Sequence, residues 1–164
     1  MMSPSWLALV KKPKIRVFKW GITHSFIYRV YNTARKTWTA WNNLKKQRFG
    51  HGCAKLGKKI IVAGGRNFWE RLSSTEIIDV ATGVVRFGGP LKEPRRNLQL
   101  VTLGGHFQKI LAIGGYNWLL SYNYNIDAIE EWNDDLETWK VNPTKLQKPR
   151  HGFGAVVVPK STIC

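Results

Sequence analysis

Two short apolar runs along the chain each end in a pair of glycines. Lys59 to Gly65 reads K-I-I-V-A-G-G, and fifty positions later Lys109 to Gly115 reads K-I-L-A-I-G-G. An unbroken aliphatic run is typical of a strand buried on both faces, and glycine adopts backbone conformations that a side chain would forbid. The pattern therefore predicts two equivalent buried strands, each ending in a sharp turn, in a chain built from repeats.

A second pattern of apolar and polar positions recurs three times. The run F-I-Y-R-V-Y that begins at Phe26, followed by N-T-A-R-K-T-W, predicts two paired strands. Two later segments align with this one without gaps. The first aligned position holds an acid or its replacement (Arg29, Glu76, Glu130), and two residues later stands an aromatic or aliphatic residue (Tyr31, Ile78, Trp132). Nine residues after the first position stands a tryptophan or its replacement (Trp38, Val85, Trp139). The recurrence predicts one such pair of strands in each of three units.

An arginine precedes a further strand-like segment in each unit, at Arg48, Arg95 and Arg150. The three segments read G-H-G-C-A-K-L, N-L-Q-L-V-T-L and G-F-G-A-V-V-V, and each is expected to form a strand. A unit of about fifty residues with four short antiparallel strands is typical of a propeller blade.

The double glycine, the E-x-aromatic-D/N step and the tryptophan nine residues after the acid stand in kelch order, and residues 26–164 resemble a kelch-repeat protein. The resemblance implies an all-β fold: a kelch-type β-propeller fragment with two full four-stranded blades, roughly Arg48 to Pro94 and Arg95 to Pro149, plus two partial blades. The first unit departs from the pattern at Arg29, and the second at Ile78 and Val85.

The blade number leaves the ring incomplete. Propellers close with about four to eight blades. We expect either a piece of a longer propeller or an oligomer that completes the ring, with self-association through the open edges.

The charge of the chain adds a constraint on its partners. It contains 26 lysine and arginine residues against 10 aspartate and glutamate residues, a net charge of +16, and its pI is near 10.2. Such a field attracts acidic partners and repels copies of the chain itself. An acidic protein partner is expected, and a basic surface that binds nucleic acid is the alternative.

Residues 1–25 show no periodicity and are expected to form a basic, irregular N-terminal segment. The run from Lys11 to Trp20, K-K-P-K-I-R-V-F-K-W, mixes cations with aromatic residues, which also suits an arm on nucleic acid or on a membrane surface. The apolar stretch from Ser5 to Val10 is too short for a signal peptide or a membrane span. No membrane span is predicted, and a cytoplasmic location is expected, or secretion if a signal peptide lies upstream.

The sequence contains no catalytic pattern. Its four histidines lack metal-ligand spacing, and two cysteines, Cys53 and Cys164, are too few for a disulfide framework. Kelch-type copper oxidases need a constellation of tyrosine, cysteine and histidine that these residues do not supply. Glu76 and Glu130 recur at one blade position, so each is expected to bond neighbouring backbone or an adjacent arginine. No enzymatic activity, cofactor or metal is expected.

The loops after the two glycine pairs differ from each other and are rich in aromatic residues. They read R-N-F-W-E-R-L-S-S after Gly65 and Y-N-W-L-L-S-Y-N-Y-N after Gly115. Variable loops on a rigid scaffold often carry recognition, and Trp and Tyr bury a large area with few rotatable bonds. The candidate contacts are Trp69, Tyr116, Trp118, Tyr122 and Tyr124, with packing between blades as the alternative.

The kelch resemblance adds a second set of candidates. In kelch substrate adaptors, the arginine that opens each blade and the residue after the double glycine contribute to one binding face. The matching positions here are Arg48, Arg95 and Arg150, with Arg66 and Tyr116. Such arginines suit a carboxylate or phosphate through bidentate hydrogen bonds, although a purely structural role remains open.

The resemblance thus implies a protein-binding module, the recognition part of a scaffold or ubiquitin-ligase substrate adaptor with an acidic partner. A secreted or actin-associated kelch protein is a further alternative. No BTB-like helical domain is recognised in the sequence, so a link to a ligase would need upstream sequence or another subunit.

Overall fold

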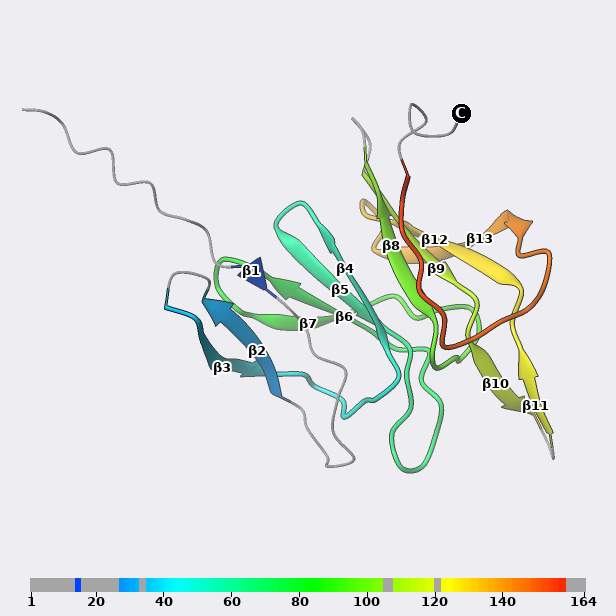
Figure 1. Cartoon of the computed structure of the whole chain (residues 1–164), viewed down its shortest axis with the longest axis horizontal. Coiled ribbons are helices and arrows are strands. Elements are labelled where there is room, and N and C mark those ends of the chain that lie inside the picture. Colours follow the sequence, from blue (N-terminus) through cyan, green and yellow to red (C-terminus); the bar gives the residue numbers. More distant parts are fainter. Residues whose placement is uncertain (1–13, 16–26, 33–34, 105–107, 120–121, 159–164) are drawn as a thin grey trace, which may run out of the picture.

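The computed structural model describes residues 14–15, 27–32, 35–104, 108–119 and 122–158, and every regular element in them is a β-strand (Figure 1). The strands are β1 (Lys14–Ile15), β2 (Ile27–Asn32), β3 (Thr37–Asn43), β4 (Gly52–Leu56), β5 (Lys59–Ala63), β6 (Thr75–Asp79), β7 (Val85–Gly88), β8 (Gln99–Leu103), β9 (Lys109–Ile113), β10 (Tyr116–Leu119), β11 (Tyr122–Asn125), β12 (Ala128–Asn133) and β13 (Thr138–Lys145).

These strands form antiparallel sheets that follow the predicted units. Strands β4-β5-β6-β7 make one four-stranded sheet, here called blade 1, and β8-β9-β12-β13 make another, blade 2. Strands β1-β2-β3 form a smaller sheet, the first partial blade, and β10-β11 form a separate hairpin. The prediction of an all-β partial propeller with two full blades is confirmed.

The two glycine-ended runs are the second strands of their blades, as predicted. Strand β5 pairs with β4 on one side and β6 on the other, and β9 pairs in the same way with β8 and β12. Gly64 and Gly65 adopt φ of 68° and 95°, where a side chain would strain the backbone. The glycine pair therefore ends the buried strand and turns the chain into the loop that follows.

The cross-strand register confirms the alignment of the three units. The paired positions are Tyr31 opposite Trp38, Ile78 opposite Val85, and Trp132 opposite Trp139. Each unit therefore presents the same two positions on the same face of its outer strands.

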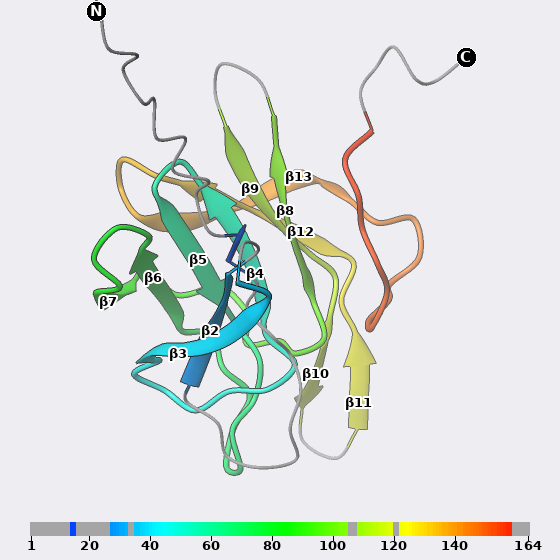
Figure 2. The same ribbon diagram turned by 60° about the vertical axis from the view of Figure 1, so that its left-hand side comes forward.

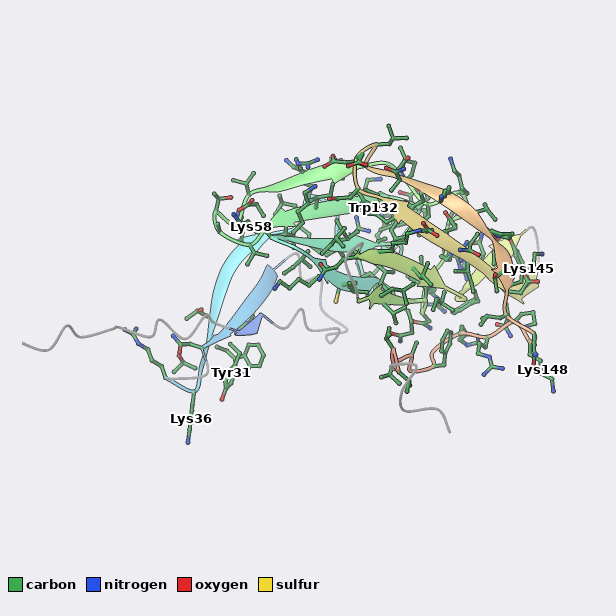
Figure 3. All side chains as sticks on the ribbon, turned by 90° about the horizontal axis from the view of Figure 1, so that it is seen from above. Tyr31, Lys36, Lys58, Trp132, Lys145 and Lys148 are labelled. Atoms are coloured by element: carbon green, nitrogen blue, oxygen red, sulfur yellow. The ribbon has the colours of Figure 1, made fainter. Side chains whose placement is uncertain are left out.

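Blades 1 and 2 pack against each other through a continuous hydrophobic core, in which Trp132 lies where the blades meet (Figure 3). The indoles of Trp132 and Trp139 meet edge to face at 5.2 Å and are 3% and 1% exposed. Trp139 Nε1 donates a hydrogen bond of 2.8 Å to Thr75 Oγ1 in blade 1. The aromatic pair thus fixes one blade on the other by burial and by a directed bond.

The first partial blade has one strand more than the two predicted from Phe26 onward. Lys14 and Ile15 lie opposite Tyr31 and Val30 of β2, on the side of β2 that corresponds to the place of β5 beside β6. The remainder of the expected N-terminal segment lies outside the described residues.

Two further departures concern the loops. The region after Gly115, expected to be a loop, forms the β10-β11 hairpin, which extends from the end of blade 2 (Figure 2). The prediction of a strand after Arg150 is wrong, because residues 152–158 belong to no strand. In both full blades the equivalent segment, β4 or β8, pairs with the glycine-ended strand of the same blade. The described residues contain no third glycine-ended strand with which residues 152–158 could pair.

Candidate functional site

The arginine that opens blade 1 lies inside the blade. Arg48 is 5% exposed. Its Nη1 donates to the carbonyl oxygens of Gly64 and Ser74 at 2.8 and 2.9 Å, and its Nη2 donates to Glu76 Oε1 at 2.7 Å. Burial lowers the pKa of Arg48 and the charge of Glu76 opposes this. Both Nη groups of the guanidinium are therefore bonded within its own blade, whereas its buried Nε has no hydrogen-bond partner among the described residues.

Blade 2 repeats this arrangement. Arg95 is 1% exposed, and its Nη1 donates to the carbonyl oxygens of Gly114 and Ala128 at 3.2 and 3.0 Å. Its Nη2 donates to Glu130 Oε1 at 2.6 Å. For Arg48 and Arg95 the structure therefore favours the architectural role that the sequence left open over a contact with a partner.

The two glutamates serve their blades, as predicted. Glu76 also accepts hydrogen bonds from the backbone N–H groups of Lys45 and Lys46, at 2.6 and 3.1 Å. Glu130 accepts one from the backbone N–H of Lys92 at 2.8 Å. Each carboxylate joins the opening arginine to the loop before it.

Arg150 differs from the other two opening arginines. It is exposed, and its Nε donates to the carbonyl oxygen of Lys148 at 3.3 Å.

Backbone hydrogen bonds join each unit to the next at repeated positions. The second glycine of each pair donates to the carbonyl oxygen of the next opening arginine: Gly65 to Arg95 at 2.8 Å, and Gly115 to Arg150 at 2.9 Å. Two residues after the arginines, Asn97 donates to Gly50 at 2.6 Å and Gly152 donates to Asn97 at 2.9 Å. As a result, the residue that follows an opening arginine lies beside the residue that follows a glycine pair: Phe49 beside Arg66, and Arg96 beside Tyr116.

Where these two positions meet, an arginine and an aromatic residue face each other across an isolated β-bridge. Phe49 bridges Arg66, and the Arg66 guanidinium lies 5.0 Å from the centre of the Phe49 ring. Arg96 bridges Tyr116, and its guanidinium lies 4.4 Å from the Tyr116 ring. Blade 2 thus exchanges the positions of cation and ring relative to blade 1.

Further side chains gather on Tyr116, which is 8% exposed. The guanidinium of Arg71 lies 5.3 Å from its ring, and the ring of His151 lies 4.6 Å from it. Arg71 also forms a β-bridge with Arg66. We call the whole set the arginine–aromatic cluster: Phe49, Arg66, Arg71, Arg96, Tyr116 and His151.

Three positively charged guanidinium groups, those of Arg66, Arg71 and Arg96, lie close enough in this cluster to repel one another. Burial, followed by the charge of Arg66, lowers the pKa of Arg71. Burial, followed by the charges of Arg66 and Arg71, lowers the pKa of Arg96. The Nε of Arg96 is buried and has no hydrogen-bond partner among the described residues.

Trp69 lies at the tip of the loop that contains Arg66 and Arg71, and it is 93% exposed. The side chain of Asn67 shapes this loop, because its Oδ1 accepts from the backbone N–H of Trp69 at 2.9 Å and of Glu70 at 2.8 Å. Lys46 and Glu70 form an exposed ion pair of 3.5 Å beside it. The indole is thus presented to solvent from a fixed turn.

The remaining candidates belong to the β10-β11 hairpin. Tyr124 donates from its hydroxyl to Glu93, and Asn117 Nδ2 donates to that hydroxyl at 3.4 Å. The bond to Glu93 is the main cause that raises the pKa of Tyr124. Tyr124 therefore joins the hairpin to the loop before Arg95, and the side chains of Trp118 and Tyr122 lie outside those described.

Four members of the cluster were absent from the sequence candidates: Phe49, Arg71, Arg96 and His151. A signal for three of them existed, since Phe49, Arg96 and His151 each directly follow an opening arginine. Arg71 carries no such signal, because its place depends on the turn around Asn67.

The described residues contain neither a candidate metal site nor a candidate membrane-spanning helix. In the described ranges, no group of three or more His, Cys, Asp or Glu side chains could hold a metal ion. Within those same ranges, no helix has the length and apolarity needed to cross a membrane.

Comparison with known proteins agrees with the blade architecture. Residues 47–92 match the family described as the kelch motif. Over 70 residues the chain is 39% identical to a Xenopus laevis protein described as "Influenza virus NS1A-binding protein homolog", a match that covers 43% of this chain and 10% of that protein. The chain therefore spans only about a tenth of the length of that relative. The chain thus carries a kelch motif at residues 47–92 and has the sheet architecture of a partial kelch β-propeller.

Proposed function

We propose that the arginine–aromatic cluster binds an acidic segment of a partner protein. One observation carries the proposal: three guanidinium groups, those of Arg66, Arg71 and Arg96, gather around two aromatic rings at the junction of the blades. Burial and then the charge of Arg66 lower the pKa of Arg71, and burial and then the charges of Arg66 and Arg71 lower the pKa of Arg96. An anion among them would relieve this repulsion. Guanidinium groups stacked on rings keep their edges available for bidentate hydrogen bonds to carboxylates.

The surroundings support a peptide-sized ligand. Among the described residues, neither Arg66 nor Arg96 forms an ion pair with an acid of the chain. Trp69 lies on the same loop as Arg66 and is exposed, so it would add an apolar anchor beside the cationic site. Tyr116 is buried and serves as the ring on which the cations stack.

We further propose that this module is the recognition part of a larger scaffold or ubiquitin-ligase adaptor. The support is the kelch motif and the name of the relative, which describes a homologue of an influenza virus NS1A-binding protein. In such an assembly the cluster would select the partner, and other segments or subunits would recruit the ligase.

A comparison of two anions tests whether the ligand is a protein segment. The probes are a fluorescent peptide of about eight glutamates and a thymidine oligonucleotide of equal charge, because nucleic-acid binding driven by phosphate charge falls steeply with salt. We expect tighter binding of the peptide, measured by fluorescence anisotropy over a range of salt concentrations. Tighter binding of the oligonucleotide, with a steep linear dependence of log affinity on log salt, would favour the nucleic-acid alternative.

A further inference from the structure

The arginines of the full blades and those of the cluster differ in the charge that faces them. Inside each full blade, one guanidinium meets one carboxylate: Arg48 meets Glu76 at 2.7 Å, and Arg95 meets Glu130 at 2.6 Å. The arginine–aromatic cluster instead gathers three guanidinium groups around two rings. A ligand with a single carboxylate would therefore leave positive charge in the cluster unbalanced.

The loop of Arg66 orients its guanidinium. The Nε of Arg66 donates to the carbonyl oxygen of Asn67 at 3.0 Å, and the guanidinium lies over the Phe49 ring at 5.0 Å from its centre. Among the described residues, no acceptor bonds the Nη groups of Arg66. A ligand therefore meets Arg66 through these two Nη groups.

Arg71 and Arg96 share the ring of Tyr116, and their guanidinium groups lie 5.3 and 4.4 Å from its centre. Both side chains are half-buried, and the Nε of each is buried. A ligand can therefore reach them only at their Nη ends. The two Nη groups of a guanidinium form a pair of parallel donors, which fits two oxygens of one anionic group.

We propose that the cluster binds a phosphorylated residue in the acidic segment of the partner, an inference that rests on the function proposed above. A phosphate on a side chain carries a charge of about −1.5 to −2 at pH 7 and three acceptor oxygens. One such group offers an oxygen to each of the three guanidinium groups, whereas a carboxylate has two oxygens and a single charge. The rings of Phe49 and Tyr116 hold the guanidinium groups in place for this contact.

One phosphate also binds at a lower cost than several carboxylates of equal total charge. Two glutamates lose the rotamer freedom of two side chains and the hydration of two carboxylates, whereas a phosphoserine orders one short side chain. Burial and then neighbouring arginine charges lower the pKa values of Arg71 and Arg96. A dianion among these charges relieves more of their repulsion than a single negative charge does.

The loop that carries Arg66 and Arg71 favours a peptide as the carrier of the phosphate. Its tip presents Trp69, which is 93% exposed, on a turn fixed by the side chain of Asn67. A peptide can place its phosphate in the cluster and a neighbouring apolar side chain on the indole. A nucleic-acid backbone carries only one charge per phosphate, and it matches the cluster less well.

Three fluorescent peptides of otherwise identical sequence test the inference on the full chain. At one central place they carry phosphoserine followed by alanine, two glutamates, or serine followed by alanine. We expect the phosphoserine peptide to bind about tenfold or more tightly than the two-glutamate peptide, because one group meets all three arginines. Fluorescence anisotropy measures the affinities at physiological ionic strength and about pH 7.5, where the phosphate is a dianion.

Arg96→Lys separates the shape of the cluster from its charge. Lysine keeps the positive charge but loses the planar pair of donors and the stacking on Tyr116, so we expect the preference for phosphoserine to fall to about twofold. Arg66→Lys is a second variant with the same expected result. Arg35→Lys, at the exposed β2-β3 turn, is the matched control and should keep the full preference. Near-UV circular dichroism checks that each variant keeps its tertiary structure.

The outcomes separate this inference from the function on which it rests. Equal affinity for the phosphoserine and two-glutamate peptides would overturn the inference and leave the binding of an acidic segment in place. If neither these peptides nor the peptide of eight glutamates binds, both proposals are wrong.

Three further results would each overturn the inference. One is a preference for phosphoserine that survives in both Arg96→Lys and Arg66→Lys, and another is a preference that Arg35→Lys removes to the same extent. The third is a thymidine trinucleotide, which has a similar total charge, binding as tightly as the phosphoserine peptide.

Discussion

Among single residues, the most confined charges are the two arginine–glutamate pairs inside the blades. The Arg48 and Glu76 side chains are 0% exposed, and Glu76 also accepts two backbone hydrogen bonds. A buried charge is tolerated only when it is paired and hydrogen-bonded. Each pair therefore makes its blade depend on a contact between the loop before the blade and its third strand.

Glu76→Ala should destabilise the protein strongly. The substitution leaves the Arg48 charge buried and removes the acceptor for two backbone N–H groups, so we expect the free energy of unfolding to fall by about 3 to 5 kcal/mol. Asp127→Ala is the control, because its ion pair with Lys145 is exposed and is expected to contribute about 1 kcal/mol or less. Urea unfolding followed by tryptophan fluorescence measures both, and equal losses would contradict the architectural role.

At the scale of single elements, the turn after each glycine-ended strand joins one blade to the next. Gly64 has φ of 68°, and a Cβ built on it would lie 2.6 Å from the carbonyl oxygen of Arg95. Gly114 repeats this geometry, with its Cβ position 2.6 Å from the carbonyl oxygen of Arg150. The first glycine of the pair therefore permits the close approach of consecutive units, in addition to the turn.

Gly57→Ala and Gly64→Ala separate these two requirements. Gly57 has φ of 54° and open space around its Cβ position, so alanine there should cost only the left-handed backbone strain, about 1 to 2 kcal/mol. Gly64→Ala adds a clash with backbone and should cost about 1 to 3 kcal/mol more. Thermal unfolding by circular dichroism gives the difference. If the two variants melt together, the junction does not need the close approach.

The elements that could be predicted are those with repeated local signals. The glycine runs and the Trp132 and Trp139 positions identified the strands and their register, because apolar pattern and turn residues act within a few positions. Residues 152–158 show where this fails: strand-like composition does not make a strand without a neighbouring strand to pair with. The β10-β11 hairpin was missed because Asn117 and Tyr124 face each other across a turn that no glycine pattern marks.

For the molecule as a whole, the kelch resemblance indicated the opening arginines and the residue after each glycine pair, but not the residues after the opening arginines, which complete the cluster at the blade junction. It also did not distinguish the arginines that are buried in ion pairs from those that face rings. Arg48 and Arg95 are buried because glutamates from another strand reach them. Arg66 and Arg96 face rings instead. That distinction depends on contacts between strands, which spacing along the chain does not encode.

The central claim is that this local cluster, and not the net charge of the chain, binds an acidic partner. The most direct measurement compares the affinity of the glutamate peptide for two variants that each lose two positive charges. One is Arg66→Gln with Arg96→Gln. The other is Lys36→Gln with Lys58→Gln, at two exposed lysines in the β2-β3 and β4-β5 turns (Figure 3).

We expect the arginine variant to bind the peptide about tenfold or more weakly, because charge-assisted hydrogen bonds are lost. The lysine variant should stay within about twofold of the wild-type chain, since exposed distant charges are screened. Anisotropy titrations at physiological ionic strength measure both. An equal loss of affinity in the two variants would contradict the claim.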